Sequence, residues 1–245
     1  RRQRQMCIRD RTQSVYFFWS YLKMIELKED ITFSIPSGNF GHAYAGWTAK
    51  QMGLPIKRLL IATNKNDVLH QTFSTNNYSK TGVVQTLAPS MDISVASNFE
   101  RLLYNLYDDN SSILAKNMRS FPAKSIDIPQ AKKELVASFF NSFRSDDEEI
   151  IQEIKETFTR HDYLLDPHTA TGVRASNGIV NKEEPVITMG TAHPAKFTEA
   201  IEKALPSYTS ELPNKVAKAF EQDEIFTILP DDYLEIKQFI LSKAL

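Results

Sequence analysis

The chain has little of what marks secreted or membrane-embedded proteins. Cys7 is the one cysteine among 245 residues, which excludes an internal disulfide and favours a reducing compartment, so we expect a cytoplasmic protein. No apolar run approaches the roughly 20 residues that a membrane-spanning helix needs, and no secretory signal is visible. The 29 basic and 30 acidic residues nearly balance, so we expect no nucleic-acid partner and no membrane partner.

Common site signatures are also absent. The sequence contains no G-x-x-x-x-G-K-[ST] loop, no G-x-G-x-x-G fingerprint and no G-x-S-x-G elbow, which argues against the usual nucleotide sites and serine hydrolases. His161, His168 and His193 have neither H-E-x-x-H spacing nor paired cysteines beside them. We therefore predict no metal site.

The composition along the chain indicates its domain organisation. Residues 1–11 hold five arginines in no helical or strand period, and we interpret them as a non-native or disordered basic segment ahead of the folded residues 12–245. Between about residues 110 and 160 no convincing strand is visible, and patterns such as Ala131–Phe143 predict a helical insertion. The apolar run Val15–Ile25 predicts a mostly buried helix.

The most informative segment is a turn between a strand and a helix. The β-branched run Ile31–Ile35 predicts a strand, Ala43–Met52 spaces its apolar residues like a helix, and Pro36–Gly41 lies between them. The first N–H groups of a helix have no partner within it, and the helix dipole adds partial positive charge there. Glycine lets the backbone approach an anion closely. The sequence therefore predicts that a phosphate-bearing ligand binds at this turn.

Further strands lead into similar corners and predict an α/β fold with a parallel sheet. Ile56–Thr63 reads as a strand joined to the first through one helix, which makes a βαβ unit. Tyr163–Leu165 reads as a strand that runs into Asp166–Thr169, where Asp166 suits a helix N-cap. Pro185–Met189 likewise runs into Gly190–Lys196. Such corners meet at the carboxyl ends of parallel strands, where ligands bind.

Taken together, six segments resemble the threonine synthase family. They are Pro36–Pro55, Leu60–Asp67, Pro89–Ile93, Ser97–Leu103, Asp166–Ala170 and Thr191–Phe197. The resemblance extends from about residue 13 to the end and implies the tryptophan-synthase-β-like fold (fold type II), in which helices flank a parallel sheet. It also implies pyridoxal 5'-phosphate (PLP) as cofactor. The family converts the small molecule O-phospho-L-homoserine, with water, into L-threonine and phosphate.

The resemblance also implies which residues hold the cofactor. The cofactor phosphate would be bound by the amides and side chains of the first turn, namely Ser37, Gly38, Asn39, Phe40 and Gly41. His42 stands where family members often have Asp, and its backbone N–H is added to this set. Thr191 would hydrogen-bond the pyridine nitrogen, and a hydroxyl partner leaves that nitrogen less protonated than a carboxylate would.

The family's Schiff-base lysine has no counterpart in this chain. That lysine stands in an aromatic-Lys-Asp context, whereas Lys50, Lys57 and Lys65 read as surface or helix residues. We therefore expect no catalytic residue here and interpret the chain as the C-terminal half of the enzyme, inactive alone, with the lysine upstream. The initial Arg in place of Met also favours a fragment.

Arg101 is the candidate for binding the substrate phosphate, which needs cationic or amide partners. Ser97 and Glu100 have the spacing of a capping box at the start of the same predicted helix. Because Arg101 would lie just inside this capped helix, a structural ion pair is an equally suitable role for it.

Other functions remain open at this point. Within the same fold, the alternatives are a serine or threonine dehydratase, a cysteine synthase or a phospholyase. From a different class, the chain could be a catalytically inactive homologue that binds a phosphorylated metabolite. An intact aromatic-Lys-Asp segment upstream would favour the synthase.

Overall fold

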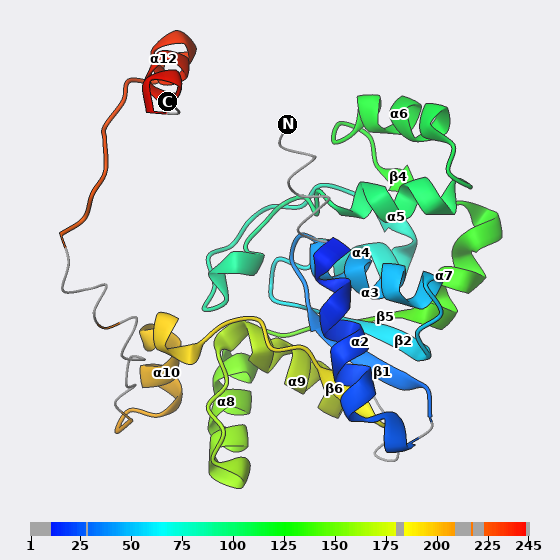
Figure 1. Cartoon of the computed structure of the whole chain (residues 1–245). Coiled ribbons are helices and arrows are strands. Elements are labelled where there is room, and N and C mark those ends of the chain that lie inside the picture. The colour runs from blue at the N-terminus through cyan, green and yellow to red at the C-terminus, as the bar shows by residue number, and fades with distance from the viewer. Residues whose placement is uncertain (1–10, 28, 180–183, 209–216, 218–222, 244–245) are drawn as a thin grey trace. The chain divides into compact units, whose positions relative to one another are not determined.

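A parallel sheet forms the core of the larger part of this structure. The computed structural model describes residues 11–27, 29–179, 184–208, 217 and 223–243. Its main sheet has four parallel strands in the order β5 (Phe140–Arg144), β2 (Ile56–Thr63), β1 (Ile31–Pro36) and β6 (Val186–Thr188) (Figure 1). The predicted α/β fold with a parallel sheet is thus confirmed.

Helices and short elements connect these strands. The α-helices among the described residues are α2 (Ser14–Lys23), α3 (Gly41–Gln51), α4 (Val68–Thr75), α5 (Phe99–Leu106), α6 (Ser111–Ser120), α7 (Lys133–Phe139), α8 (Asp147–His161), α9 (Pro167–Ile179), α10 (Thr198–Ala204) and α12 (Tyr233–Lys243). Short 3-10 helices are η1 (Ile25–Leu27), η2 (Pro89–Met91), η3 (Gln130–Lys132) and η4 (Pro194–Lys196). A small antiparallel pair joins β3 (Asn77–Tyr78) to β4 (Ile126–Asp127).

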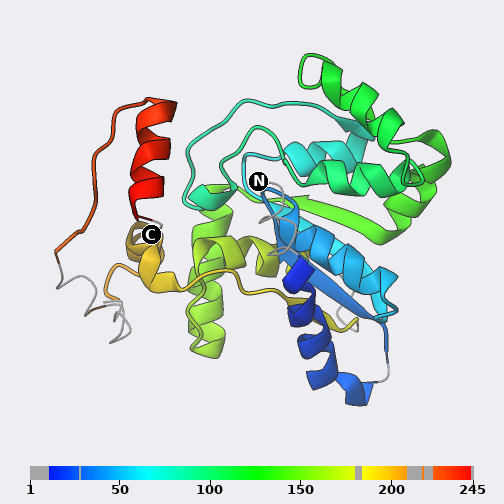
Figure 2. The ribbon, with the colours of Figure 1, turned by 45° about the horizontal axis from the view of Figure 1, so that its top comes forward.

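Helices cover both faces of the main sheet because its strands are apolar on both faces. Side chains alternate along β2, so Leu59 joins the core that contains Phe17 of α2 and Trp47 of α3, whereas Leu60 packs with Ala175 of α9. Figure 2 shows α8 and α9 on one side of the sheet and α2 and α3 on the other. The first turn of α3 and that of α9 therefore approach the same sheet edge from opposite faces.

Strand β5 corrects the prediction that residues 110–160 contain no strand. It pairs in parallel with β2 and begins where α7 ends, inside the predicted helix Ala131–Phe143. The apolar residues keep a helical spacing there, but tertiary packing decides the conformation. Phe140 is buried against the rings of Phe40 and Phe73, and the extended backbone completes the open edge of β2.

Two other expectations are also wrong. The first helix is not mostly buried, since Phe17 is the buried residue of α2 while Trp19 is 61% exposed. Residues 163–165 form no strand, and Tyr163 is itself 63% exposed. An apolar composition alone does not supply the pairing partner that a strand needs.

The chain divides into two compact units, residues 1–210 and 211–245. The first unit contains the main sheet, and the described part of the second contains α12. Of the predicted basic segment, residues 1–10 lie outside the described residues. Among the described helices, none has the length and apolar character to cross a membrane.

Candidate functional site

The turn after β1 folds as predicted and leads into the start of α3. Ser37 is buried, and its backbone N–H donates to the carbonyl oxygen of Ala62 at 2.9 Å, which continues the pairing of β1 with β2. The Oγ of Ser37 is buried without a hydrogen-bond partner. A buried hydroxyl without a partner costs free energy unless a ligand or water satisfies it. Together with the N–H groups at the start of α3, this hydroxyl suits an anion.

Phe40 determines the shape of this turn. Its φ of 65° is left-handed, which costs a non-glycine residue about 1–2 kcal/mol. Its ring is fully buried, 5.3 Å from the ring of Phe99 and 6.0 Å from that of Phe140. Burial of a Phe side chain is worth roughly 1.5–3 kcal/mol, which offsets the backbone cost. The aromatic core therefore holds the turn in a conformation that the turn alone would not favour.

Neighbouring segments pack closely on the same turn. A Cβ on Gly38 would lie 2.9 Å from the Cα of Met91, so only glycine lets η2 approach this closely. The carbonyl oxygen of Asn39 accepts from the N–H of Asn98 at 3.2 Å, and its Oδ1 accepts from Ser97 Oγ at 2.7 Å. The predicted capping box is therefore wrong, since Asn98 is the N-cap of α5 and no side chain caps it. Ser97 anchors the turn instead.

The other two corners meet this turn at the same sheet edge. Beyond β6, the N–H of Met189 donates to the carbonyl oxygen of Ser34 in β1 at 2.9 Å. Neighbouring strands lie about 4.8 Å apart. Thr191, exposed just beyond this point, therefore lies beside the turn that follows β1. Asp166 caps α9 as predicted, since its Oδ1 accepts from the N–H of His168 at 2.9 Å.

All three corners line one cavity of about 150 Å³. Its lining residues are Pro36, Gly38, Ser90, Met91, His168, Thr191 and Ala192. The sequence alone predicts no binding role for Ser90, Met91 or His168, although Pro89–Ile93 is among the segments that resemble the family. Both ring nitrogens of His168 make hydrogen bonds, and the described residues contain no group of three or more His, Cys, Asp or Glu that could hold a metal.

His42 borders a second cavity of about 590 Å³, which is also lined by Thr191 and by Gln13 and Tyr16 of the α2 region. Its Nε2 is buried without a hydrogen-bond partner, and its ring lies 5.2 Å from that of Phe17. Burial lowers the pKa of His42 to about 4. The imidazole is therefore neutral at pH 7 and adds no positive charge to the anion site.

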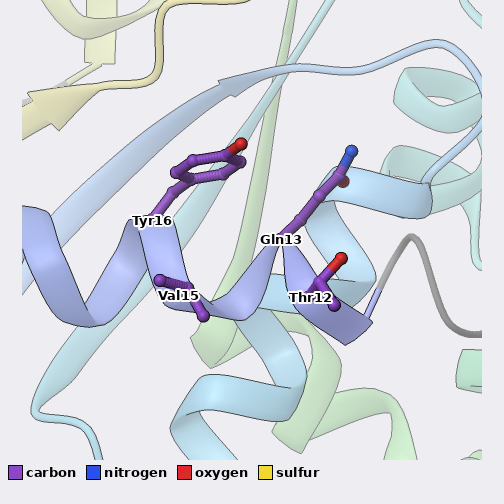
Figure 3. A pocket seen from close by; sticks show the side chains of 4 residues that line it. All are labelled: Thr12, Gln13, Val15 and Tyr16. Carbon is purple, nitrogen blue, oxygen red and sulfur yellow. The ribbon is translucent and has the colours of Figure 1, made fainter.

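Cavity size alone does not locate the site. A hollow of about 620 Å³ lies at the start of α2 and is lined by Thr12, Gln13, Val15 and Tyr16 (Figure 3). These side chains offer hydroxyls, one amide and one apolar group, but neither a charged group nor a strong nucleophile. The smaller cavity at the three corners has more groups in its lining that could bind or orient a ligand.

The cationic residues considered above lie outside the 150 Å³ cavity. The guanidinium of Arg101 lies 4.5 Å from the ring centroid of Tyr44 and packs α5 on α3. Lys50 Nζ donates to a backbone carbonyl oxygen of β2 at 2.7 Å, and Lys57 Nζ lies 2.8 Å from a carboxylate oxygen of Glu184. Arg101 as a substrate ligand stays a prediction.

Comparison with known proteins assigns the chain to a family. The family model described as "Threonine synthase, C-terminal" matches residues 169–240. Threonine synthase of Pseudomonas aeruginosa is 40% identical over 230 residues, which make up 93% of this chain and 49% of that protein. The chain belongs to the threonine synthase family.

Solved threonine synthases also share its architecture. The crystal structure of PLP-bound threonine synthase from Brucella melitensis has a TM-score of 0.87 at 34% identity and covers 95% of this chain and 50% of that one. Threonine synthase from yeast has a TM-score of 0.83 at 32% identity, over 95% of this chain and 51% of that one. The fold is that of these threonine synthases, and the chain spans about half the length of the relatives it matches.

Proposed function

We propose that this chain forms the cofactor-binding half of a threonine synthase, a PLP-dependent lyase that converts O-phospho-L-homoserine and water into L-threonine and phosphate. One observation carries the proposal. The Ser37–Gly41 turn after β1 and Thr191 after β6 lie at the ends of neighbouring parallel strands, and Gly38 and Thr191 line the same cavity. The PLP-bound Brucella melitensis structure, similar over 95% of this chain, supports it.

The residues present fit PLP at both of its ends. The phosphate would be held by Ser37 Oγ, which has no partner within the protein, and by N–H groups from Gly38 to His42 at the start of α3. The hydroxyl of Thr191 would contact the ring nitrogen. When bound, PLP supplies an electron sink for carbanion chemistry at the substrate. The task of this chain is to hold and orient it.

The catalytic lysine is proposed to lie in the part of the relatives that this chain does not cover. No lysine is among the described residues that line the cavity, and Lys50 and Lys57 are engaged elsewhere. Residues 12–245 would then be the C-terminal part of the catalytic domain, with an insertion near residues 110–160 that also supplies β5. A biosynthetic role and a lone cysteine support a cytoplasmic location.

Arg101 is proposed to bind the substrate phosphate. It lies in the first turn of α5, the helix whose preceding residues Ser97 and Asn98 hydrogen-bond to Asn39 of the turn. Its stacking on Tyr44 keeps the guanidinium beside α3. This placement brings a cation close to the proposed cofactor site without placing it in the cofactor cavity.

Product analysis of the full-length gene product tests the function. With O-phospho-L-homoserine, phosphate and L-threonine should form in equal amounts, as measured by a phosphate assay and chromatography. Formation of 2-oxobutyrate without threonine would contradict the synthase and indicate a dehydratase or phospholyase. Binding of PLP or the phosphorylated amino acid without turnover would indicate an inactive homologue.

Two glycine variants provide the matched controls. Gly38→Ala places a Cβ against Met91 and should abolish both turnover and PLP binding. Gly82→Ala faces open space and should retain both. Equal activity of the two variants would show that the turn at Gly38 is not the cofactor site.

A further inference from the structure

Asp166 makes more contacts than a helix cap requires. Its Oδ1 accepts from the backbone N–H groups of His168 at 2.9 Å and Thr169 at 3.3 Å, which is the capping function. The same oxygen lies 3.0 Å from His168 Nδ1, and Oδ2 accepts from the hydroxyl of Thr169. A capping Asn or Ser would offer one acceptor oxygen. The two oxygens of the carboxylate instead connect the cap to two further side chains.

The first connection runs through His168 to η2. A carboxylate only accepts, so His168 Nδ1 carries the proton and donates to Asp166. The other ring nitrogen, Nε2, then accepts from the backbone N–H of Ser90 at 3.1 Å. The ring also packs against Phe197, with centroids 4.7 Å apart. This connection holds the Ser90–Met91 wall of the cavity over Gly38.

The second connection runs through Thr169 to Thr191. The single hydroxyl proton of Thr169 goes to Asp166, so Thr169 Oγ1 acts only as an acceptor toward other groups. It accepts from the N–H of Thr191 at 3.1 Å, and it lies 3.4 Å from Thr191 Oγ1. Any proton between these two oxygens must therefore come from Thr191. Thr191 is therefore held beside Thr169 through its backbone N–H and through its hydroxyl.

We propose that Asp166 is a positioning residue that holds both walls of the cofactor cavity, through His168 on one side and Thr169 on the other, and that it thereby fixes the position of the Thr191 hydroxyl beside the ring nitrogen. The proposal rests on the proposed function, because it takes PLP as the ligand. A hydroxyl held in one position can hydrogen-bond the ring nitrogen without first being ordered by the ligand, which lowers the cost of binding.

Burial and charge agree with this role. Asp166, His168 and Thr169 are all buried, whereas Thr191 is exposed and needs an anchor to keep one orientation. Burial raises the pKa of the Asp166 carboxyl, but hydrogen bonds from His168 and Thr169 outweigh it, and the net effect lowers that pKa. The carboxylate therefore remains an acceptor at neutral pH. Preorganised partners of this kind lower the cost of binding.

The test measures PLP binding by variants of the full-length gene product. Asp166→Asn keeps an oxygen for the cap but replaces the second acceptor with a donor, and Thr169→Val removes the hydroxyl at nearly constant volume. Both should weaken PLP binding roughly tenfold, the effect of losing one or two buried hydrogen bonds. Thr169→Ser keeps the hydroxyl and should bind PLP within about twofold of the native protein.

A matched control separates positioning from simple loss of stability. Thr171 is buried on the same helix and donates to the carbonyl oxygen of His168 at 2.7 Å, away from the cavity. Thr171→Val should lower the melting temperature about as much as Thr169→Val yet leave the dissociation constant of PLP unchanged. Equal PLP affinity of these two variants would overturn the proposal.

Nitrogen NMR gives a readout that a merely structural role would not change. With PLP labelled with ¹⁵N in the ring, Thr169→Val should shift the ring-nitrogen signal relative to the native protein, because the Thr191 hydroxyl is no longer held in one position, whereas Thr171→Val should leave the signal unchanged. An unchanged signal in Thr169→Val would overturn the role of Thr169 in positioning Thr191. If the native protein binds no PLP, the proposed function itself fails.

Discussion

At the residue scale, the site depends on groups that ordinary folding leaves without partners. Ser37 Oγ and His42 Nε2 are both buried without a hydrogen bond, and Phe40 holds a left-handed backbone. Each of these features lowers the free energy of unfolding unless a ligand or water compensates for it. They cluster within six residues, at the start of one helix. Such a cluster is expected where a ligand recovers part of the cost.

The buried imidazole of His42 should make stability sensitive to acid. The pKa of His42 is about 4 in the folded protein against an ordinary 6.5. Between pH 6.5 and 4, His42 is therefore protonated in the unfolded chain but stays neutral in the folded protein. The free energy of unfolding consequently falls as the pH falls. The loss amounts to roughly 3 kcal/mol over this range. His42→Gln should remove it, as measured by urea unfolding at a series of pH values.

His161 provides the control for this measurement. It is exposed at the end of α8, so His161→Gln should leave the dependence of the unfolding free energy on pH unchanged. The lowered pKa of the Asp166 carboxyl affects stability only below about pH 5, where carboxyls of the unfolded chain begin to take up protons, so the comparison with His42→Gln is made chiefly above that pH. A native protein whose stability is flat between pH 6.5 and 4 would show that His42 is not buried as described.

At the element scale, β5 connects the sheet to the turn. Phe140, its first residue, packs against Phe40 of the turn and against Trp47 of α3, with ring centroids 6.0 and 5.7 Å away. The same strand extends the sheet beyond β2. The conformation of the turn therefore depends on a strand about one hundred residues further along the chain.

Replacing Phe140 should destabilise the whole first unit. Phe140→Ala leaves a cavity among four aromatic side chains and should lower the free energy of unfolding by about 3–5 kcal/mol. Leu135→Ala on the preceding helix α7, where the side chain is 45% exposed, should cost under about 1 kcal/mol. Urea denaturation measures both values. Similar losses for the two variants would contradict the buried placement of β5.

At the scale of the whole molecule, the proposed function assigns to this chain the groups that hold the cofactor but not the lysine that binds it covalently. It spans about half the length of the threonine synthases it matches. No lysine is among the described residues that line the 150 Å³ cavity. Covalent attachment and catalysis should therefore need residues that are not in this chain.

Reductive trapping of the 245-residue chain tests this expectation. Mixed with one equivalent of PLP and treated with borohydride, the chain should show no specific pyridoxylated lysine by peptide mass spectrometry. The full-length gene product should show one. A single lysine of this chain that is modified in stoichiometric amount, and protected by excess inorganic phosphate, would contradict the assignment.

Much of the site could be predicted because its signals are local. Ser37–Gly41 and Asp166–Thr169 lie where a strand or loop enters a helix, and the capping and turn preferences that mark such places act over three or four residues. The position of Met91 over Gly38 could not be predicted in this way. It depends on hydrogen bonds between Ser90 and His168, which are 78 residues apart. Strand β5 was missed for the same reason.

The sequence by itself determined which chemical groups stand at the three corners, and it determined that β1 and β6 lead into two of them and that α3 and α9 begin at two of them. Only the tertiary structure decided that η2 covers Gly38, that Ser97 anchors Asn39 rather than capping α5, and that Asp166 connects both walls of the cavity. The reason is physical. Backbone preferences depend on near neighbours, whereas the choice of contacts between distant segments depends on the packing free energy of the whole core.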